Sequence, residues 1–588
     1  VKYDGKDWLV KKHHALEAAP ELAPPAVAAA PAGYPAASPA MPAAAPKMVG
    51  KGKGKAKHVK GVICDPSIVA GAAAVCKVEW DQDARERAWT EYNGSVLETA
   101  LTVVEELGES PVRLVDARFI VELAKRSGRL PRRQDLPEEC FISLEQLKRL
   151  PVGGWQNDCL RIVAISHPWQ QPDHPDPKGI NLQILAGVLS SFLKKSGGTY
   201  SVFLDFLSVH QKGPNLEDRT PEESELFSLA LTNMMDWYGH PKILTFKITK
   251  LPDGYPSGFD FPEGCAPNVA GYFDRGWCFC ESSVSNLSTD NVEVLDLGKL
   301  SGTKTELSHI VKECEAQRRP PLSPQQFKLE LATKSFTSKR TDEEMVSNLY
   351  ASTITRQFRE VKELMYSTLS WGDEEMALLA QTLEAVACPK LVGFYAKYNR
   401  IGDAGCTALA KAIVARTYPK LEDLDLQRNQ IGDGGCTALG NACAKGALPK
   451  LATLSLEKNR IRDAGCTALA EACAAGKLPN LKELKLSINE IGDEGVENLA
   501  EACEARQLPK LAELRLDENK FGDGGITYLA YACLSNPLPN LAELRLQRNQ
   551  IGDHGCSALA KAYADGAFPK LETLYLHENL IGDRGCTA

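Results

Sequence analysis

The most regular pattern in the chain is a leucine framework, LxxLxL, that recurs every 30 residues in the C-terminal part from Leu421 onward. An asparagine accompanies the framework at the same interval: Asn399, Asn429, Asn459, Asn489, Asn519, Asn549 and Asn579. Such a framework is typical of a short strand whose leucines face the interior. Cys436, Leu439 and Cys443 then stand at i, i+3 and i+7, which predicts a helix with one buried stripe. The pattern therefore predicts a solenoid of strand and helix units over 361–588.

Two polar positions in each unit have structural roles that the spacing predicts. The asparagine amide can satisfy backbone groups of the turn that would otherwise be buried unpaired. The aspartate four residues later, such as Asp433, can cap the helix that follows it by accepting from N–H groups of the first turn. Arg462 stands where other units have glycine and is expected to strain its turn. Leu369 replaces the asparagine in a degenerate copy, 361–390, which we expect to cap the N-terminal end of the solenoid.

The consensus LxxLxLxxNxIGDxGxxALAxA closely resembles leucine-rich repeats of the ribonuclease-inhibitor type, which also occur in nucleotide-binding innate-immune receptors. The resemblance implies a right-handed α/β solenoid with strands on a concave face, helices outside, and a protein-binding role. The sequence stops inside its last repeat, which is therefore truncated. We expect the final coil, with Leu571, Leu574 and Leu576, to fray.

Residues between the framework leucines point away from the core and form two rows on the predicted concave face. One row holds Asp425, Ser455, Lys485, Arg515, Arg545 and Tyr575, and the other holds Asp423, Thr453, Glu483, Glu513, Glu543 and Thr573. Three consecutive acidic residues therefore lie beside three consecutive basic ones. This is either a charge ladder that keeps the face hydrated or a mixed-charge groove that selects a protein partner, with Tyr395, Tyr575 and His577 as aromatic anchors.

The region 61–360 has the composition of a globular domain with a helical preamble, which we expect at 81–107 and 114–126. Short apolar runs predict strands at 161–165, 201–206, 242–248 and 292–297, and helical patterns lie between them at 180–194, 222–238 and 272–285. Strands that alternate with helices of this length predict β-α-β units. The chain is therefore expected to hold an α/β domain with a mainly parallel sheet in front of the repeats.

Polar and aromatic residues follow the predicted strands of this domain, and ligands of parallel sheets bind at the carboxyl ends of strands. The candidate cluster consists of Ser166, His167, Trp169, Asp205, His210, Gln211, Arg275, Trp277 and Glu281. The order of these residues resembles the heterokaryon-incompatibility domain of fungi over about 161–297, although Phe203, Ser208 and Cys280 depart from its motifs. That resemblance implies a fold like the Toll/interleukin-1-receptor domain and a role in signalling. Packing and scaffolding are the alternative role for the same residues.

Two functions remain open for the α/β domain. The sequence favours a non-enzymatic signalling adaptor, in which the repeats recognise a protein and the α/β domain is the effector. The alternative is an enzyme that cleaves NAD, with Glu281 as its catalytic carboxylate by analogy with Toll/interleukin-1-receptor-like domains. No P-loop, GxSxG or kinase motif is present in the sequence. His167, His174 and His210 lack the spacing of zinc ligands, so we predict no metal and no cofactor.

Composition adds constraints on partners and on compartment. Residues 1–60 are rich in Ala and Pro and then in Lys and Gly, which predicts a disordered segment; its Lys-rich part, 47–60, could make at most a weak contact with nucleic acid. The formal charge of -8 gives no other reason to expect nucleic-acid binding. No apolar run is long enough to span a membrane. The 18 cysteines are expected to be reduced thiols, which favours a cytoplasmic or nuclear protein.

Overall fold

The computed structural model describes residues 64–76, 89–90, 93–150, 159–213, 217–261, 265–287, 294–302, 306–336 and 339–587. The predicted disordered segment, 1–60, with its Lys-rich part, lies outside the described residues. No helix in the described ranges is both long and apolar enough to cross a membrane. All 18 cysteines lie in the described ranges and are free thiols, as predicted.

The α/β domain contains a six-stranded sheet with the strand order β2-β1-β4-β3-β5-β6. Its strands are β1 (Leu114–Asp116), β2 (Phe141–Ile142), β3 (Ile162–Ser166), β4 (Ser201–Leu204), β5 (Leu244–Lys247) and β6 (Val294–Asp296). The four strands β3 to β6 pair in parallel, which confirms the mainly parallel sheet. β1 pairs antiparallel with β2 and β4, and neither β1 nor β2 was expected.

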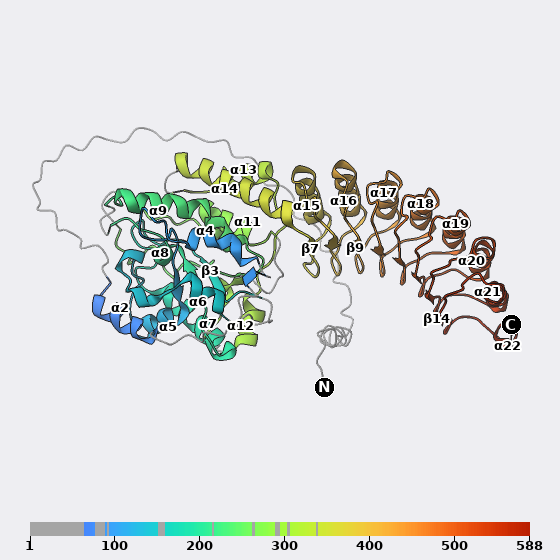
Figure 1. Ribbon diagram of the computed structural model, residues 1–588, viewed down its shortest axis with the longest axis horizontal. Helices are drawn as coiled ribbons and strands as arrows, with labels where there is room; N and C mark the ends of the chain where they lie inside the picture. The colour runs from blue at the N-terminus through green and yellow to red at the C-terminus, as the bar shows by residue number, and fades with distance from the viewer. Residues whose placement is uncertain are drawn as a thin grey trace, which may run out of the picture. The chain divides into compact units, whose positions relative to one another are not determined.

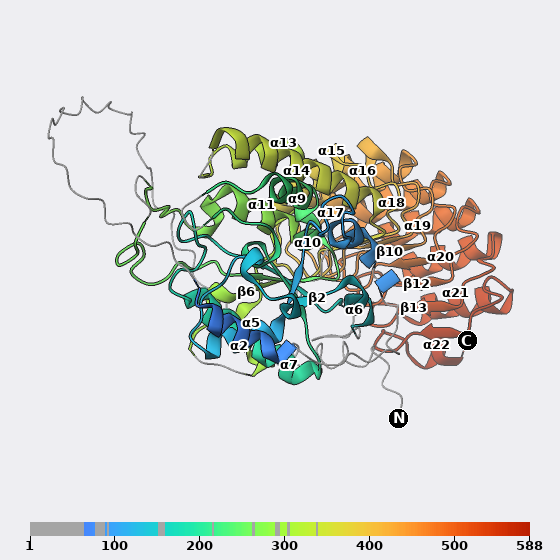
Figure 2. The ribbon, with the colours of Figure 1, turned by 60° about the vertical axis from the view of Figure 1, so that its left-hand side comes forward.

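Helices cover both faces of this sheet in two groups, and the helices that are labelled in both views lie on opposite sides of it (Figures 1 and 2). One group comprises α2 (Pro66–Ala73), α5 (Ala117–Lys125), α7 (Ile180–Ser196) and α12 (Leu307–Cys314), and the other α9 (Pro221–Thr232), α10 (Met234–Gly239), α11 (Gly276–Val284), α13 (Pro324–Leu331) and α14 (Lys339–Glu360). The first group packs on one apolar core and the second on another. The sheet is therefore buried between two layers of helices, as parallel sheets require.

Short elements complete the domain: α4 (Glu98–Leu101), α6 (Leu144–Arg149), α8 (Asp205–Ser208), η1 (Ala74–Cys76), η2 (Gly94–Leu97), η3 (Arg133–Asp135), η4 (Glu138–Cys140), η5 (Tyr272–Asp274) and η6 (Leu297–Lys299).

The predicted helix 114–126 was wrong at its start. Asp116 is the last residue of β1, and its carboxylate accepts from the N–H of Arg118 at 2.8 Å, so the helix begins at Ala117. The predicted helix 222–238 is two helices that meet at Asn233.

The C-terminal part is the predicted solenoid, with an eight-stranded parallel sheet in the order β14 to β7. The strands are β7 (Glu363–Met365), β8 (Gly393–Tyr395), β9 (Asp423–Asp425), β10 (Thr453–Ser455), β11 (Glu483–Lys485), β12 (Glu513–Arg515), β13 (Glu543–Arg545) and β14 (Thr573–Tyr575). The helices are α15 (Asp373–Ala385), α16 (Asp403–Arg416), α17 (Asp433–Ala444), α18 (Asp463–Ala474), α19 (Asp493–Glu504), α20 (Asp523–Ser535), α21 (Asp553–Ala564) and α22 (Asp583–Thr587). Figure 1 shows the helices along one side of the sheet, which leaves its other side, the sheet face, uncovered by them.

The asparagines satisfy buried turn groups as predicted. Asn489 donates through Nδ2 to the carbonyls of Leu456 and Leu486 at 3.0 Å, and its Oδ1 accepts from the N–H of Ile461 at 3.1 Å. Each asparagine thus joins its own coil to the preceding one. Since an unpaired buried amide or carbonyl is costly, this ladder explains the strict recurrence of asparagine.

The prediction that each aspartate caps its own helix was wrong. The Oδ1 atom of Asp493 accepts from the N–H groups of Gly522 at 2.7 Å and Gly525 at 2.9 Å, which begin the helix of the next repeat. Asp373, Asp403, Asp433, Asp463, Asp523 and Asp553 make the same pair of bonds. The carboxylate therefore caps the adjacent helix and holds consecutive helices together.

The expectation that Arg462 strains its turn was also wrong. Its φ of -111° and ψ of -164° are extended and close to those of Gly432, which stands at the same position one repeat earlier. The left-handed residue of the turn is instead the one before the asparagine, such as Lys458 with φ of 53°. Glycine is therefore not needed at position 462 for its backbone conformation.

The degenerate copy forms the terminal coil of the solenoid, since β7 is the last strand of the sheet. The apolar residues of this coil are not exposed to solvent, because the α/β domain covers them. Tyr366 donates through its hydroxyl to the carbonyl of Leu287 at 3.0 Å, and the indole N–H of Trp371 donates to the carbonyl of Arg318 at 3.0 Å. Buried apolar side chains form one cluster from Trp237 through Tyr366 to the repeats. The α/β domain thus provides the cover expected of the degenerate copy.

Candidate functional site

The first candidate site is the polar row at the carboxyl ends of β3, β5 and β6. Strand pairing places Ser166 beside Lys247, and Lys247 beside Asp296. Paired residues on neighbouring strands point to the same face. The sequence prediction missed Lys247. Its signal was a lysine between the apolar residues of ILTFKI, where a charged residue is uncommon unless it has a partner. The row therefore puts a buried amine next to the predicted Ser166.

Helix α11 closes over this row and contributes Glu281. Ser166 donates from Oγ to Oε2 of Glu281, and the same Oγ lies 2.5 Å from the hydroxyl of Tyr272. Lys247 donates from Nζ to Oγ of Ser282 at 3.0 Å. Burial raises the pKa of Glu281 to about 8, and the nearby Asp205 adds to the rise while the bond from Ser166 opposes it. Burial also lowers the pKa of Lys247 to about 7.

The consequence for chemistry is that Glu281 carries its proton at neutral pH. A protonated carboxyl can hydrogen-bond to Ser166 without the cost of burying a charge. It is a poor nucleophile or general base in that state. The hydrogen bonds among Ser166, Glu281 and Tyr272 lock α11 onto the sheet, so the geometry suits a structural role better than a catalytic one.

Asp205 is the centre of the second half of the predicted cluster. The indole N–H of Trp169 donates to Oδ2 of Asp205 at 2.8 Å, and the amide of Gln211 donates to the backbone carbonyl of Asp205 at 3.0 Å. His167 places Nε2 3.6 Å from Oδ1 of Asp205. The structure therefore brings Trp169, Asp205, Gln211 and His167 together at the carboxyl ends of β3 and β4, as the sequence predicted.

Arg275 and Trp277 differ in their relation to this cluster. Arg275 donates from Nε to the carbonyl of Ala270 at 3.0 Å, and its terminal nitrogens donate to the carbonyls of Trp169 and Asn268. It therefore braces the segment after β3. Trp277 does not join the cluster; its indole N–H donates to Oδ2 of Asp342 on α14 at 3.3 Å.

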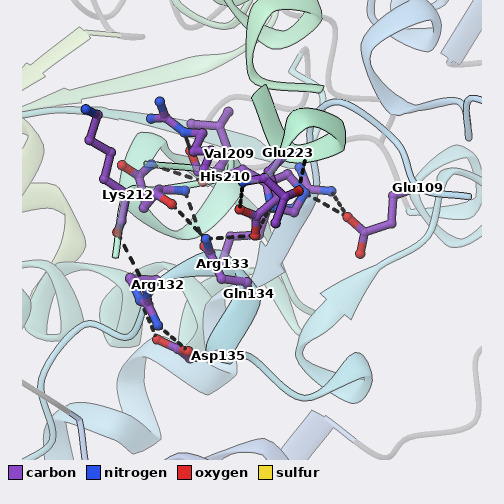
Figure 3. A network of polar contacts seen from close by, with 12 residues as sticks. Glu109, Arg132, Arg133, Gln134, Asp135, Val209, His210, Lys212 and Glu223 are labelled. Atoms are coloured by element: carbon purple, nitrogen blue, oxygen red, sulfur yellow. Dashed lines mark hydrogen bonds and ion pairs between the residues drawn. The ribbon is translucent and has the colours of Figure 1, made fainter. Parts of the chain in front are cut away.

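His210 was expected in the cluster, but its side chain makes its contacts in a neighbouring polar network, which Figure 3 shows. Its Nε2 lies 2.8 Å from Oε2 of Glu109, and the guanidinium of Arg133 donates to that same carboxylate at 3.1 Å. Gln134 joins the network by donating to the carbonyl of Gln211 at 2.8 Å. Burial and the positive charge of Arg133 lower the pKa of His210. Among the described residues, no group of three His, Cys, Asp or Glu side chains could hold a metal ion.

The second candidate site is the sheet face of the repeats. On β11, β12 and β13 each glutamate pairs with the basic residue two positions later on its own strand. Lys485 Nζ lies 2.6 Å from Oε2 of Glu483, Arg545 Nε lies 2.5 Å from Oε1 of Glu543, and Arg515 contacts Glu513. Arg515 also reaches Glu457 on β10's coil at 3.3 Å. These side chains are half-buried, and Nζ of Lys485 also lies 3.9 Å from Oε2 of Glu513 on the next strand. The predicted mixed-charge rows therefore exist as ion pairs on β11, β12 and β13.

The ends of the rows differ from their middle. Tyr575 has the guanidinium of Arg545 above its ring, 5.1 Å from the ring centroid. Asp425 has Nζ of Lys397 at 3.5 Å. Ser455 is buried among its neighbours, so it offers little contact surface.

Comparison with known proteins assigns the C-terminal repeats. The family model described as "Leucine Rich repeat" matches residues 419–440, 447–470, 477–500 and 538–560. The chain is similar to internalin C2 of Listeria monocytogenes, with 25% identity and a TM-score of 0.26 over 39% of this chain and 76% of that one. It is also similar to the Arabidopsis receptor kinase HAESA, whose structure is a complex with the peptide hormone IDA and the co-receptor SERK1, with 16% identity and a TM-score of 0.22 over 37% of this chain and 34% of that one. No curated protein matches the chain. The C-terminal part consists of leucine-rich repeats, a class of protein-binding solenoid.

Proposed function

We propose that the protein is a cytoplasmic or nuclear signalling adaptor whose leucine-rich repeats recognise a protein partner through the sheet face. The observation that carries this proposal is the in-register network of charged side chains on that face, from Glu483 to Arg545. A row of half-buried, oriented charges favours binding to a complementary surface, because the side chains are already ordered. The free cysteines support a reducing compartment.

The test uses the full chain on beads, with identification of the proteins retained. The swapped variant combines Glu483→Lys with Lys485→Glu and Glu513→Arg with Arg515→Glu, and it adds Glu457→Lys because Glu457 contacts Arg515 at 3.3 Å. It keeps opposite charges together but reverses the polarity of the network. We expect this swapped variant to lose capture and to melt close to the wild type. If Lys485 and Arg515 were replaced by glutamate without the other exchanges, like charges would be in contact and would destabilise the protein. The swapped variant avoids that effect. If the swapped variant still captures the partner and melts like the wild type, the binding surface lies on the loops after the asparagines and not on the sheet face.

The α/β domain is proposed as the effector of the adaptor. Its resemblance to heterokaryon-incompatibility domains supports a signalling role. The closed hydrogen bonds of Ser166 with Glu281 and Tyr272 support a structural role for the cluster. No cofactor is part of the proposal, and the Lys-rich segment 47–60 is proposed to contribute at most a weak contact with nucleic acid.

NAD cleavage is the second candidate function, since a carboxyl group at the strand ends is the feature such an enzyme needs. The full chain would then consume NAD, and the Glu281→Gln variant would not. Equal, negligible turnover by both proteins at high concentration would reject the enzyme. The raised pKa of Glu281 predicts that any activity would increase as pH rises through about 8, because only the ionised carboxylate is an effective nucleophile or base.

A further inference from the structure

The N-terminal end of the sheet face differs in charge from the rest. We define the acidic end as Glu363 on β7, Tyr395 on β8, and Asp423 and Asp425 on β9. Strand pairing places Gly393 between Glu363 and Asp423 in one row, and Tyr395 beside Asp425 in the next. The three carboxylates and the tyrosine therefore lie on one patch of the sheet face.

The ring of Tyr395 lies over the backbone of Gly393. A Cβ atom at position 393 would come within 2.6 Å of Cε2 and 2.7 Å of the hydroxyl of Tyr395, so only glycine leaves room for the ring. The hydroxyl lies 3.4 Å from Oδ2 of Asp423. Because Glu363 and Asp423 flank Gly393, the ring lies between two carboxylates. This is an aromatic platform with negative charge on both sides.

The electrostatics agree with this geometry. Burial raises the pKa of Tyr395 to about 12, and the carboxylates of Asp423, Glu363 and Asp425 contribute to the rise. The patch therefore has a negative potential that opposes any further negative charge. An aromatic ring face is itself electron-rich and attracts cations.

At the opposite end of the row, a basic side chain of the protein itself lies over a tyrosine ring. Tyr575 is paired with Arg545, which is its neighbour in the row and lies over its ring. The neighbours of Tyr395 in the same row are Met365 and Asp425. Lys397 is directed to Asp425. Among the described residues, it is the one basic side chain in an ion pair with these three carboxylates, whereas Glu483, Glu513 and Glu543 each have their own basic partner.

We propose that the acidic end binds a basic segment of the partner protein and seats one lysine or arginine side chain on the ring of Tyr395, between Glu363 and Asp423. This inference rests on the proposed function and names the chemistry of its partner. A guanidinium can stack on the ring and donate to the flanking carboxylates at once. A nucleic acid is repelled by the same charges.

The test measures binding of the full chain to a fluorescein-labelled peptide of alternating glycine and arginine, by fluorescence anisotropy. The matched peptide has glutamate in place of arginine and is expected not to bind. Tyr395→Leu removes the ring and should weaken binding of the arginine peptide about two- to fivefold, which is the usual range of a cation–π contact. Tyr395→Phe keeps the ring and should bind like the wild type.

A second variant keeps the test valid if Tyr395→Leu disturbs folding. The pair Glu363→Gln and Asp423→Asn removes two charges with little change of shape and should weaken binding of the arginine peptide about fivefold or more. The control is Glu374→Gln, an exposed residue of α15 on the helical side of the repeats, which should leave binding unchanged.

Two outcomes would overturn the inference. One is no binding of the arginine peptide, and the other is binding that all of these variants retain equally, which would indicate unspecific attraction. The proposed function fails separately: if the swapped variant at Glu483 to Arg515 still captures the partner, the sheet face is not the recognition surface. If the swapped variant loses capture while the acidic-end variants retain it, the adaptor function stands and the basic-segment inference is wrong.

Discussion

Asp493 shows how a single side chain can hold two repeats together. Its carboxylate accepts from two N–H groups that begin the next helix, at Gly522 and Gly525. We predict that Asp493→Ala lowers the free energy of unfolding by about 1 kcal/mol, the usual cost of losing a helix cap. Glu494→Ala is the matched control, because Glu494 is the next residue of the same turn and is exposed. Urea denaturation measures the free energy of unfolding of both variants. An equal decrease in the two would contradict the role of Asp493 in joining consecutive repeats.

Glu281 has a buried carboxyl whose pKa is raised to about 8. The folded protein therefore keeps a proton that the unfolded chain releases at its ordinary pKa near 4.3. Between these values unfolding releases a proton, so the free energy of unfolding falls as pH rises. Lys247, with its pKa lowered to about 7, has the opposite effect above that pH, because the unfolded chain there binds the extra proton.

The buried carboxyl of Glu281 should make the stability of the protein depend on pH between about 4.3 and 8. The Glu281→Gln variant keeps a hydrogen-bonding side chain but cannot ionise. We expect the stability of the wild type, relative to this variant, to fall steadily across the range, since the variant lacks the proton release. Urea denaturation at several pH values measures the difference. A constant difference would mean that the carboxyl of Glu281 is not buried in its neutral form.

The turn between strand and helix offers a matched pair of substitutions at the scale of the element. Lys458 adopts φ of 53°, which disfavours any residue with a Cβ, whereas Arg462 is extended with φ of -111°. We predict that Lys458→Gly stabilises the protein by about 0.5 to 1 kcal/mol, because relief of strain exceeds the entropy cost of glycine. Arg462→Gly should destabilise it by about the same amount, because there is no strain to relieve, the entropy cost of glycine remains and the exposed ion pair with Glu490 is lost. Thermal melts of both variants test this, and a gain at Arg462 would show that its turn is strained after all.

Elements with a strong period could be predicted from the sequence, and those that depend on contacts far along the chain could not. The 30-residue spacing of Asn399 and its equivalents defined the repeats. The 30-residue spacing did not predict which helix Asp493 caps. A carboxylate at this position can reach its own helix or the helix of the next repeat, and the spacing is the same in both cases. β1 and β2 have three and two residues, which is too short for an alternation to show. Lys247 was missed for a similar reason, since its partner Ser282 is known only from the packing of α11.

At the scale of the whole molecule, the α/β domain and the first repeats share one apolar core. Phe279 of α11 stacks on Phe327 of α13 with ring centroids 5.1 Å apart, and Phe327 stacks on Tyr350 of α14 at 3.8 Å. The same cluster continues through Tyr366 and Trp371 into the solenoid. Unfolding of the first coil would expose the core of the α/β domain, so we expect the two to unfold together. This also means that the binding tests need the full chain and not the isolated repeats.

Arg318 is the residue that tests this coupling. It donates from Nε to the carbonyl of Asn286 at 3.0 Å and from Nη1 to the carbonyl of Met365 on β7, and its guanidinium lies 4.6 Å from the ring centroid of Tyr366. It therefore joins the end of α11 to the first strand of the solenoid. The side chain of the next residue, Arg319, is more than half exposed and forms an ion pair with Glu330 of the α/β domain, at 3.6 Å.

We predict that Arg318→Ala lowers the free energy of unfolding by roughly 2 to 3 kcal/mol, because it leaves buried carbonyls unpaired. The backbone amides of the β7 coil, such as that of Tyr366, should also exchange faster with solvent, since they lose their cover. Arg319→Ala should change the free energy of unfolding by less than about 1 kcal/mol, the usual limit for an exposed ion pair. Hydrogen exchange followed by mass spectrometry compares the first coil with the interior coil of Leu484 in both variants. Unchanged protection of the first coil in Arg318→Ala would mean that the solenoid is stable without the α/β domain as its cover.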